Sequence, residues 1–193
     1  KPARGRRCRA SSKPIAEAMG AKVHHNKFKS FGDQRNWAID HIPCKHPWHF
    51  HLDADERFTP AVVEEMVRRL GADGSGSHDA CYLCPSKMMF LGRWIKRSAG
   101  YPSYQVRLFR FGQCRFTDFG HGQREVPTGT TGVMDEPYVH FGFSKGLTEW
   151  LYKHNEYSNR EAAEGVAIRG EKPPSLRQLW QRDPTARRRA FKN

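Results

Sequence analysis

Two aspartates, Asp53 and Asp55, stand two positions apart directly after a short alternating segment, residues 48–52. In the stretch WHFHLDADERFTP this alternation predicts a strand, and the aspartates follow its end. Ligands of α/β sheets bind beyond the carboxyl ends of the strands, and two carboxylates in one turn can hold one divalent cation. Mg²⁺ or Mn²⁺ bound in this way completes its coordination with water and substrate phosphates. The pair therefore indicates a metal site that would bind a diphosphate.

Simpler roles for these acids stay open. A bare D-x-D pattern is short and common, so both residues can also be solvated turn residues. They can equally supply favourable negative charge ahead of the helix that is expected to begin after Thr59. A calcium loop over residues 53–64 is excluded, because Arg57 occupies a ligand position and Phe58 stands where the tight turn needs glycine.

The first half of the chain predicts an alternation of helices and strands that could position this motif. Such an alternation is typical of an α/β sheet. The expected elements are a helix in residues 11–20, a strand at 21–25, a helix near 33–42, the strand at 48–52 and a helix over 60–70.

The helix over residues 60–70 carries start and stop signals. Thr59 can cap it, Pro60 suits its first turn and Gly71 ends it. Glu65 is expected to form a solvent-exposed pair with Arg69 one turn later. The apolar stripe that should face the core consists of Val63, Met66, Val67 and Leu70.

The second half of the chain predicts a mixed or antiparallel group of strands. Within the first of them, Cys81 and Cys84 form a C-x-x-C pattern, but on a strand they point to opposite faces, which opposes zinc binding. Together, the helices and strands of the first half and the strands of the second half predict a mixed sheet flanked by helices. The expected elements are strands at 80–90, 103–111, 114–119 and 136–143 and a long helix over 145–164.

The positive charge of the chain is concentrated at its ends. Residues 1–13 carry six cations and no acid, and residues 171–193 carry a net charge of +5, so only +2 of the total +13 remains for residues 14–170. We expect these ranges to be a disordered basic arm, a basic amphipathic tail and the folded domain between them. A nucleic-acid-binding protein would need a basic face on the fold itself, so no nucleic acid is expected as a partner. Basic ends favour contact with a membrane surface.

Cysteine usage and hydropathy bear on the compartment. Five scattered cysteines do not form a disulfide framework and favour a reducing compartment. No apolar run approaches the roughly 20 residues of a membrane span, and no signal-peptide core follows the charged N-terminus. We expect a cytoplasmic protein, with peripheral contact at the inner face of the cytoplasmic membrane through the basic tail.

A longer pattern around the aspartates is similar to a known family. The stretch FGDQRNWAIDHIPCKHPWHFHLDADERFTPAVVEEM resembles the core of the family 2 inverting glycosyltransferases of GT-A fold, in particular bacterial lipopolysaccharide-core and exopolysaccharide enzymes. The later stretches FLGRWIKRSAGYPSYQVRLFRFG, GHGQRE and FSKGLTEWLYKHNEYSNREA look like the same subfamily. The resemblance covers roughly residues 15–192.

The resemblance implies a GT-A-like (Rossmann-like) sheet and an enzyme of cell-envelope polysaccharide synthesis. Such an enzyme transfers a sugar from a nucleotide-sugar donor to a saccharide or lipid-linked acceptor. By this resemblance Asp53 and Asp55 would bind Mg²⁺ or Mn²⁺, and Arg35 and Asn36 would lie near the nucleotide.

The resemblance also implies which residues would face the acceptor. A general base, either Asp118 or Glu125, would activate the acceptor hydroxyl to displace the nucleoside diphosphate with inversion. His121 would orient the acceptor or the base, although a role as a hydrogen-bonded loop histidine is equally open. The residues expected to line the acceptor side, each also explained by packing, are Arg93, Trp94, Tyr101 and Arg107.

The chain departs from this family at both ends. No strand is expected before residues 11–20, so the usual N-terminal nucleoside-binding segment is expected to be missing and the domain to be truncated at both ends. An incomplete, inactive enzyme is therefore one form of the family interpretation. The alternative from another class is a non-catalytic basic module that binds nucleic acid or anionic lipid through its ends.

Overall fold

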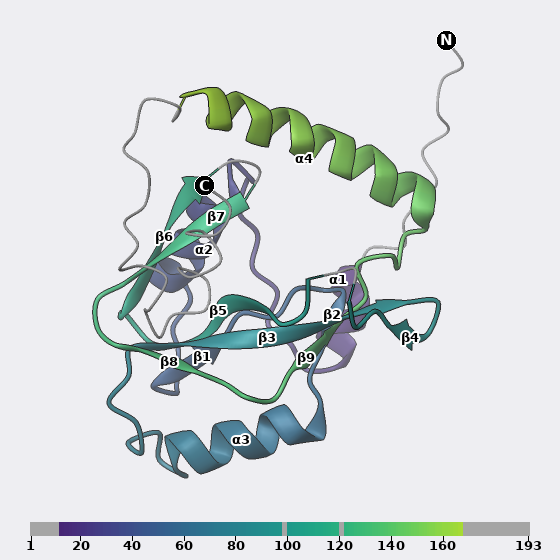
Figure 1. Ribbon diagram of the computed structural model, residues 1–193. Helices are drawn as coiled ribbons and strands as arrows, with labels where there is room; N and C mark the ends of the chain where they lie inside the picture. Colours follow the sequence, from purple (N-terminus) through teal and green to yellow (C-terminus); the bar gives the residue numbers. More distant parts are fainter. Residues whose placement is uncertain (1–11, 98–99, 120–121, 168–193) are drawn as a thin grey trace, which may run out of the picture.

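The computed structural model describes residues 12–97, 100–119 and 122–167, and it contains a mixed sheet flanked by helices, as expected (Figure 1). The described helices are α1 (Ser12–Ala18), α2 (Phe31–His41), α3 (Pro60–Leu70) and α4 (Leu147–Ala167). The described strands are β1 (Trp48–Phe50), β2 (Glu56–Arg57), β3 (Cys81–Phe90), β4 (Arg93–Trp94), β5 (Ser103–Arg110), β6 (Cys114–Phe119), β7 (Gly122–Pro127), β8 (Thr131–Val133) and β9 (Tyr138–His140).

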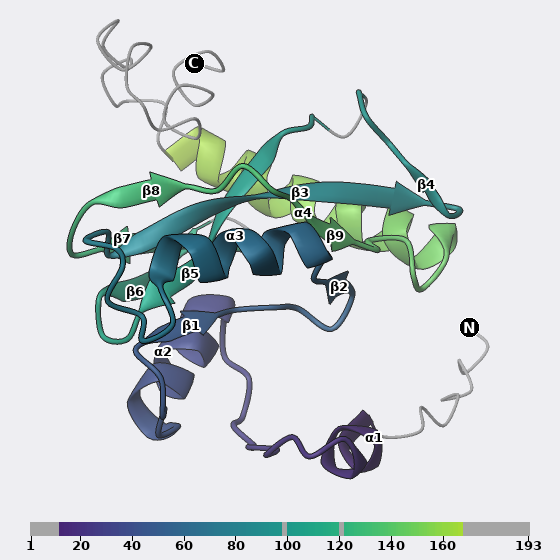
Figure 2. The same ribbon diagram turned by 90° about the horizontal axis from the view of Figure 1, so that it is seen from below.

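Strand β3 is the centre of the sheet. The strand order is β1-β5-β3-β9-β2, and β4 and β8 also pair with β3. Strand β3 runs antiparallel to β5 but parallel to β8 and β9, so the sheet is mixed. Strands β6 and β7 form a separate antiparallel hairpin that packs with α2 (Figures 1 and 2).

The sheet separates two apolar clusters, because alternate residues of β3 face opposite sides. Cys81 packs with Ile39 of α2 and with residues of β5 and β6, whereas Cys84 packs on the other side with residues of α3. The prediction that the two cysteines point to opposite faces is confirmed. Burial raises the pKa of Cys84 to about 12, so this thiol stays protonated and is a poor metal ligand.

Helix α3 begins and ends where its signals predict, but its buried face differs from the prediction. The Thr59 hydroxyl accepts a hydrogen bond from the Val62 amide, and Gly71 ends the helix with a φ of 72°. Val62 is fully buried, while two residues of the expected stripe, Val63 and Val67, are 41% and 61% exposed. The buried face of α3 is therefore rotated by about one residue from the predicted apolar stripe.

The rotated face includes Glu65, which was expected on the surface and is fully buried. Its carboxylate accepts hydrogen bonds from the backbone amides of Asp135 and Glu136 and pairs with Arg69 at 2.7 Å. These bonds satisfy an otherwise costly buried charge. They hold the loop before β9 against α3, which apolar periodicity alone does not indicate.

Two further expectations about elements are corrected. Residues 21–25 do not form a strand, because β1 is the edge of the described sheet and this segment pairs with no other strand. Strands β7 and β8 were not expected. Strand β7 pairs with β6 and strand β8 pairs with β3, so both depend on partners that local sequence patterns do not show.

Some expectations fall on parts of the chain that the structure does not describe. The basic arm over residues 1–13 lies outside the described residues except for Ser12 and Lys13, which begin α1. His121 and the tail over 171–193 also lie outside them. In the described part of the chain, no helix is both long and apolar enough to cross a membrane.

Candidate functional site

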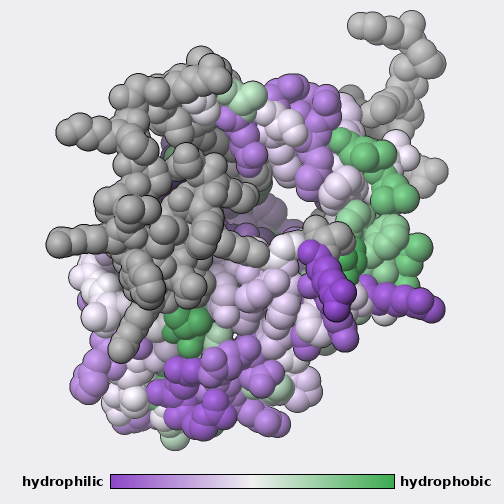
Figure 3. Space-filling view, in the orientation of Figure 1, coloured by the Kyte–Doolittle hydropathy of each residue, from purple (hydrophilic) through white to green (hydrophobic). Residues whose placement is uncertain are grey.

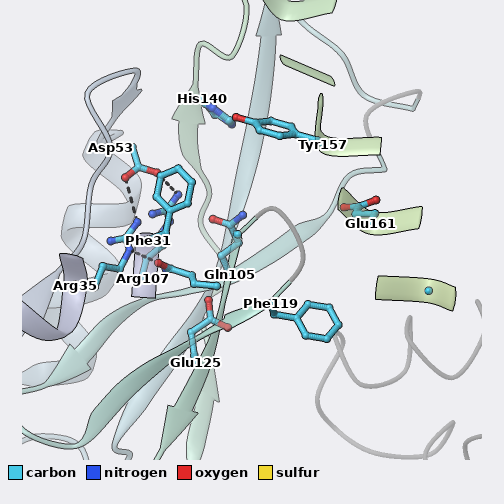
Figure 4. A pocket seen from close by; sticks show the side chains of 13 residues that line it. Phe31, Arg35, Asp53, Gln105, Arg107, Phe119, Glu125, His140, Tyr157 and Glu161 are labelled. Carbon is cyan, nitrogen blue, oxygen red and sulfur yellow. Dashed lines mark hydrogen bonds and ion pairs between the residues drawn. The ribbon is translucent and has the colours of Figure 1, made fainter. Parts of the chain in front are cut away.

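Asp53 lies where β1 ends and the chain turns toward β2. Its carboxylate is held by two guanidinium groups from different elements. Arg35 of α2 donates to Oδ1 at 3.1 Å, and Arg107 of β5 donates to Oδ2 at 3.0 Å (Figure 4). The turn that carries the D-x-D motif is therefore tied to the helix before it and to the sheet beside it.

Arg107 is the main anchor of this turn and is only 5% exposed. Besides Asp53, its guanidinium donates to the Glu56 carboxylate, to the Tyr138 hydroxyl at 3.3 Å and to the His51 carbonyl at 3.4 Å. The Glu56 carboxylate in turn accepts from the Asp53 amide at 2.8 Å. Arg107 thus lies beside the D-x-D motif, with several of its donors bonded to protein groups.

The electrostatics of this cluster follow from burial and from the arginines. Burial alone would raise the pKa of Asp53, but Arg107 and Arg35 outweigh it, so this pKa lies below its ordinary value. Burial raises the pKa of Glu56, and Arg107 opposes this only in part. Burial, assisted by the positive charge of Arg35, lowers the pKa of His51 to about 3, so its imidazole is neutral at pH 7.

Helix α2 positions Arg35 through contacts with the β6–β7 hairpin. Arg35 donates to the Gln123 side chain at 2.9 Å, and the Asn36 amide group bonds both backbone groups of Phe116. Asn36 is therefore used to dock the helix onto β6. Its neighbour in the sequence, Arg35, faces the pocket next to Asp53.

Asp118, one of the two candidate bases, lies at the N-terminal end of α2. Its Oδ1 accepts a hydrogen bond from the Gly32 amide at 3.0 Å. A Cβ at Gly32 would lie 2.9 Å from the same oxygen, so this close approach requires glycine. Asp118 thus satisfies a helix N-terminus, as a capping carboxylate does.

Glu125, the other candidate, lines the same pocket as Asp53 (Figure 4). This pocket has a volume of about 620 Å³ and lies between the D-x-D turn, β5, β7 and α4. Asp118 does not line it. Asp118 and Glu125 lie opposite Gln123 and Phe116 respectively, which makes them diagonal neighbours on one face of the hairpin, and they differ because Asp118 is bonded to the Gly32 amide. Of the two candidates, the structure places Glu125 with the metal-motif aspartate.

Sequence comparison does not assign this pocket to a family. No protein-family model matches the chain.

Several residues that line the pocket were not singled out from the sequence. Gln105 comes from β5, His140 from β9, and Tyr157 and Glu161 from α4 (Figure 4). The last two are four residues apart on one face of a helix, a spacing that could have marked them. His140 also lies 3.7 Å from the Asp55 carboxylate, but Asp55 itself lines a neighbouring groove with Phe143 and not this pocket.

A second pocket, also about 620 Å³, adjoins the first at Asp53 and Arg35, which line both. It lies beside the unpaired edge of β1 and is lined by Trp37 of α2 and by Phe28 and Lys22 from the segment before α2. Asp53 and Arg35 thus stand at a junction between two cavities. One is rich in aromatic side chains, and the other contains the carboxylate of Glu125.

The exposure of Asp53 and Asp55 bears on whether they could bind a divalent cation. In the described residues, no group of three or more His, Cys, Asp or Glu side chains could hold a metal ion. Asp53 and Asp55 keep 48% and 40% of their side chains exposed, so each has an open side. Mg²⁺ commonly takes one or two carboxylates and completes its shell with phosphates and water. The residues therefore fit a cation bound together with a diphosphate, in competition with Arg35 and Arg107.

Three residues expected on the acceptor side lie elsewhere in the fold. Arg93 and Trp94 form β4, and the Trp94 ring contacts that of Tyr101 at 4.8 Å. The Trp94 ring is also covered by Lys87 and Lys96, whose ammonium groups lie 4.8 and 5.2 Å from it. None of the three lines the pocket at Asp53.

Proposed function

We propose that the chain is an inverting, metal-dependent family 2 glycosyltransferase with a GT-A-like fold. It would transfer a sugar from a nucleotide-sugar donor to a saccharide or lipid-linked acceptor in cell-envelope polysaccharide synthesis. The observation that carries this proposal is that Asp53 and Glu125, which lie far apart in the sequence, line one pocket. This reaction needs one carboxylate to help stabilise the leaving group through a bound metal. It needs another carboxylate to take the proton from the nucleophile.

The junction of the two pockets suits a ligand with two unlike parts joined by a diphosphate. The nucleoside would occupy the pocket beside Trp37 and Phe28, since aromatic faces stack on bases. The sugar would extend into the pocket that Glu125 lines. Arg35, which lines both, would donate to the diphosphate between them.

The residues of the turn would stabilise the leaving group. Asp53 and Asp55 would hold Mg²⁺ or Mn²⁺, which supplies positive charge to the departing diphosphate. Arg107 and Glu56 would contribute indirectly. Arg107 holds the Asp53 carboxylate, and Glu56 holds the Asp53 backbone amide, through the bonds described above.

Glu125 would act on the acceptor. Its carboxylate would take the proton of the acceptor hydroxyl while that oxygen attacks the anomeric carbon from the side opposite the diphosphate. The bond from the anomeric carbon to the diphosphate oxygen breaks, and the nucleoside diphosphate leaves with the electron pair. The configuration at the sugar is inverted.

Replacement of the two candidate bases tests this assignment. The full chain is incubated with Mn²⁺ and a panel of nucleotide-sugars, and release of nucleoside diphosphate is measured, because water can serve as a slow acceptor. Glu125→Gln should lower turnover by about 10²-fold or more, since a general base typically contributes that much. Asp118→Asn should keep most activity, because its Oδ1 can still accept from the Gly32 amide.

Two outcomes would contradict the proposal. The first is no turnover of any nucleotide-sugar by the unaltered chain together with no binding of the panel. The second is loss of turnover in Asp118→Asn and its retention in Glu125→Gln, which would overturn the role given to Glu125.

A further inference from the structure

The turn between β3 and β4 presents a leucine in an unusual conformation. Leu91 and Gly92 are the two central residues of this hairpin, and both have positive φ angles, 47° and 77°. Turns of this kind favour Asn-Gly, because a branched side chain is strained at positive φ. Leu91 is nevertheless 85% exposed, so its side chain adds little to the core. An apolar residue held outward in a strained turn points to contact with something outside the chain.

The same hairpin is strongly basic. Residues 86–97 contain four cations and no acid, although the whole of residues 14–170 has a net charge of only +2. No acidic side chain among the residues that the structure describes forms an ion pair with any of the four. Two of them lie over the ring of Trp94. The cations are Lys87, Arg93, Lys96 and Arg97.

The start of α4 extends this surface. The Phe143 ring contacts Phe90 of the hairpin at 4.7 Å and stacks on Trp150 of α4 at 5.0 Å, which joins the two elements. Leu147 and Leu151, in the first turns of α4, are 52% and 60% exposed. In Figure 3 apolar residues gather over this region of the molecule, with strongly hydrophilic residues beside them.

An apolar groove of about 520 Å³ runs between the two elements. Leu91, Phe143 and Leu147 line it, and Asp55 and Arg57 lie along it as well. We define the hairpin surface as residues 86–97 together with the first turns of α4 and this groove.

We propose that the hairpin surface docks onto an anionic phospholipid bilayer. Leu91 and the exposed leucines of α4 would enter the interface, and the four cations would contact lipid phosphates, an arrangement that binds membranes through apolar area and charge together. A protein partner fits less well, because the centre of a protein interface is depleted in lysine and other charged residues. The surface belongs to the folded domain, and its docking can be measured without the transfer reaction proposed above, although Asp55 lines both its groove and the proposed metal site.

Vesicle flotation with the full chain tests this docking. Binding is compared on phosphatidylcholine vesicles with and without about 30% phosphatidylglycerol, whose negative surface attracts cations. The chain should bind the anionic vesicles and bind phosphatidylcholine far more weakly. Leu91→Asn should weaken binding to anionic vesicles about tenfold, because an inserted leucine side chain is lost. Arg93→Gln/Lys96→Gln should weaken it by about fivefold for each cation.

Val67→Asn is the matched control, since Val67 is an exposed apolar residue of α3 at 61% exposure. It should bind like the unaltered chain, and circular dichroism checks that every variant is folded. Failure of the unaltered chain to bind anionic vesicles would overturn the proposal. So would hairpin variants that bind as tightly as Val67→Asn, which would assign binding to the basic ends. Light scattering that shows self-association lost in Leu91→Asn, without vesicle binding, would assign the surface to a second copy of the chain.

Discussion

The D-x-D turn, residues 53–56, and the hairpin surface differ in how their charged side chains are paired. In the turn, Asp53 and Glu56 are bonded to Arg107, which is itself almost wholly buried. On the hairpin surface four cations carry no acidic partner from the described part of the chain, and the apolar residue at its tip is exposed. In the turn the buried charges are paired within the fold while Asp53 and Asp55 each keep an open side, whereas the cations of the hairpin surface face outward without such pairing. The comparison separates a site whose charges are held in place by the fold from a surface whose charges are not.

The largest expected effect is on stability at the turn. Arg107→Met leaves the buried Glu56 carboxylate without its cation and Asp53 with Arg35 alone, and breaking a buried pair costs about 3–5 kcal/mol. Arg93→Met on the hairpin surface removes an exposed cation and should change stability by at most about 0.5 kcal/mol. Urea denaturation measures both. Equal losses of stability in Arg107→Met and Arg93→Met would contradict the distinction between the D-x-D turn and the hairpin surface.

A second expected effect is on acid stability. The pKa of His51 is lowered to about 3, so the folded state excludes a proton that an unfolded histidine takes up near pH 6.5. Its contribution to stability is present above pH 6.5 and is lost as the pH falls below that value. The ring lies between Phe109 and Phe116, so His51→Phe should remain packed.

Denaturation at two pH values measures this effect. Between pH 6.5 and pH 5 the unaltered chain should lose about 2 kcal/mol more than His51→Phe does. Parallel curves for the unaltered chain and His51→Phe would show that His51 is not buried in its neutral form.

The smallest effect should have the opposite sign. Leu91→Asn places a residue that tolerates positive φ in the strained turn and should raise stability by about 0.5–1 kcal/mol. Val67→Asn, at an ordinary helical position, should lower stability by a few tenths of a kcal/mol, because asparagine is the weaker choice in a helix. A clear loss of stability in Leu91→Asn would mean that the leucine packs within the fold, and the hairpin surface would lose its main feature.

Local patterns predicted much of the secondary structure. The caps of α3 depend on residues close together in sequence, and the apolar segments between turns around residues 80–119 were recognised as strands. Contacts between distant residues were not predictable in this way. Glu65 is buried because amides 70 and 71 positions away bond to it, and Asp53 meets Arg107 from 54 positions away.

The candidate site was predictable to a similar degree. The D-x-D pair and Arg35 were identified from the sequence, and the structure places Asp53 and Arg35 together. The choice between Asp118 and Glu125 depends on how α2 docks on the β6–β7 hairpin, because both residues lie on one face of the hairpin, and the N-terminus of α2 bonds Asp118 while Glu125 lines the pocket. The pocket residues of α4 depend on how that helix lies over the sheet, which its own periodicity does not determine.

The binding of a nucleoside diphosphate with and without Mn²⁺ tests the central claim most directly. Isothermal titration calorimetry of the full chain with UDP, GDP and dTDP should show binding of at least one that is at least about tenfold tighter with Mn²⁺, because Asp53 and Asp55 fit a cation held together with a diphosphate. Asp55→Asn should abolish this gain, while Asp40→Asn, which alters a surface ion pair with Arg115, should keep it. Equal affinity with and without Mn²⁺, or a gain that survives Asp55→Asn, would contradict the account.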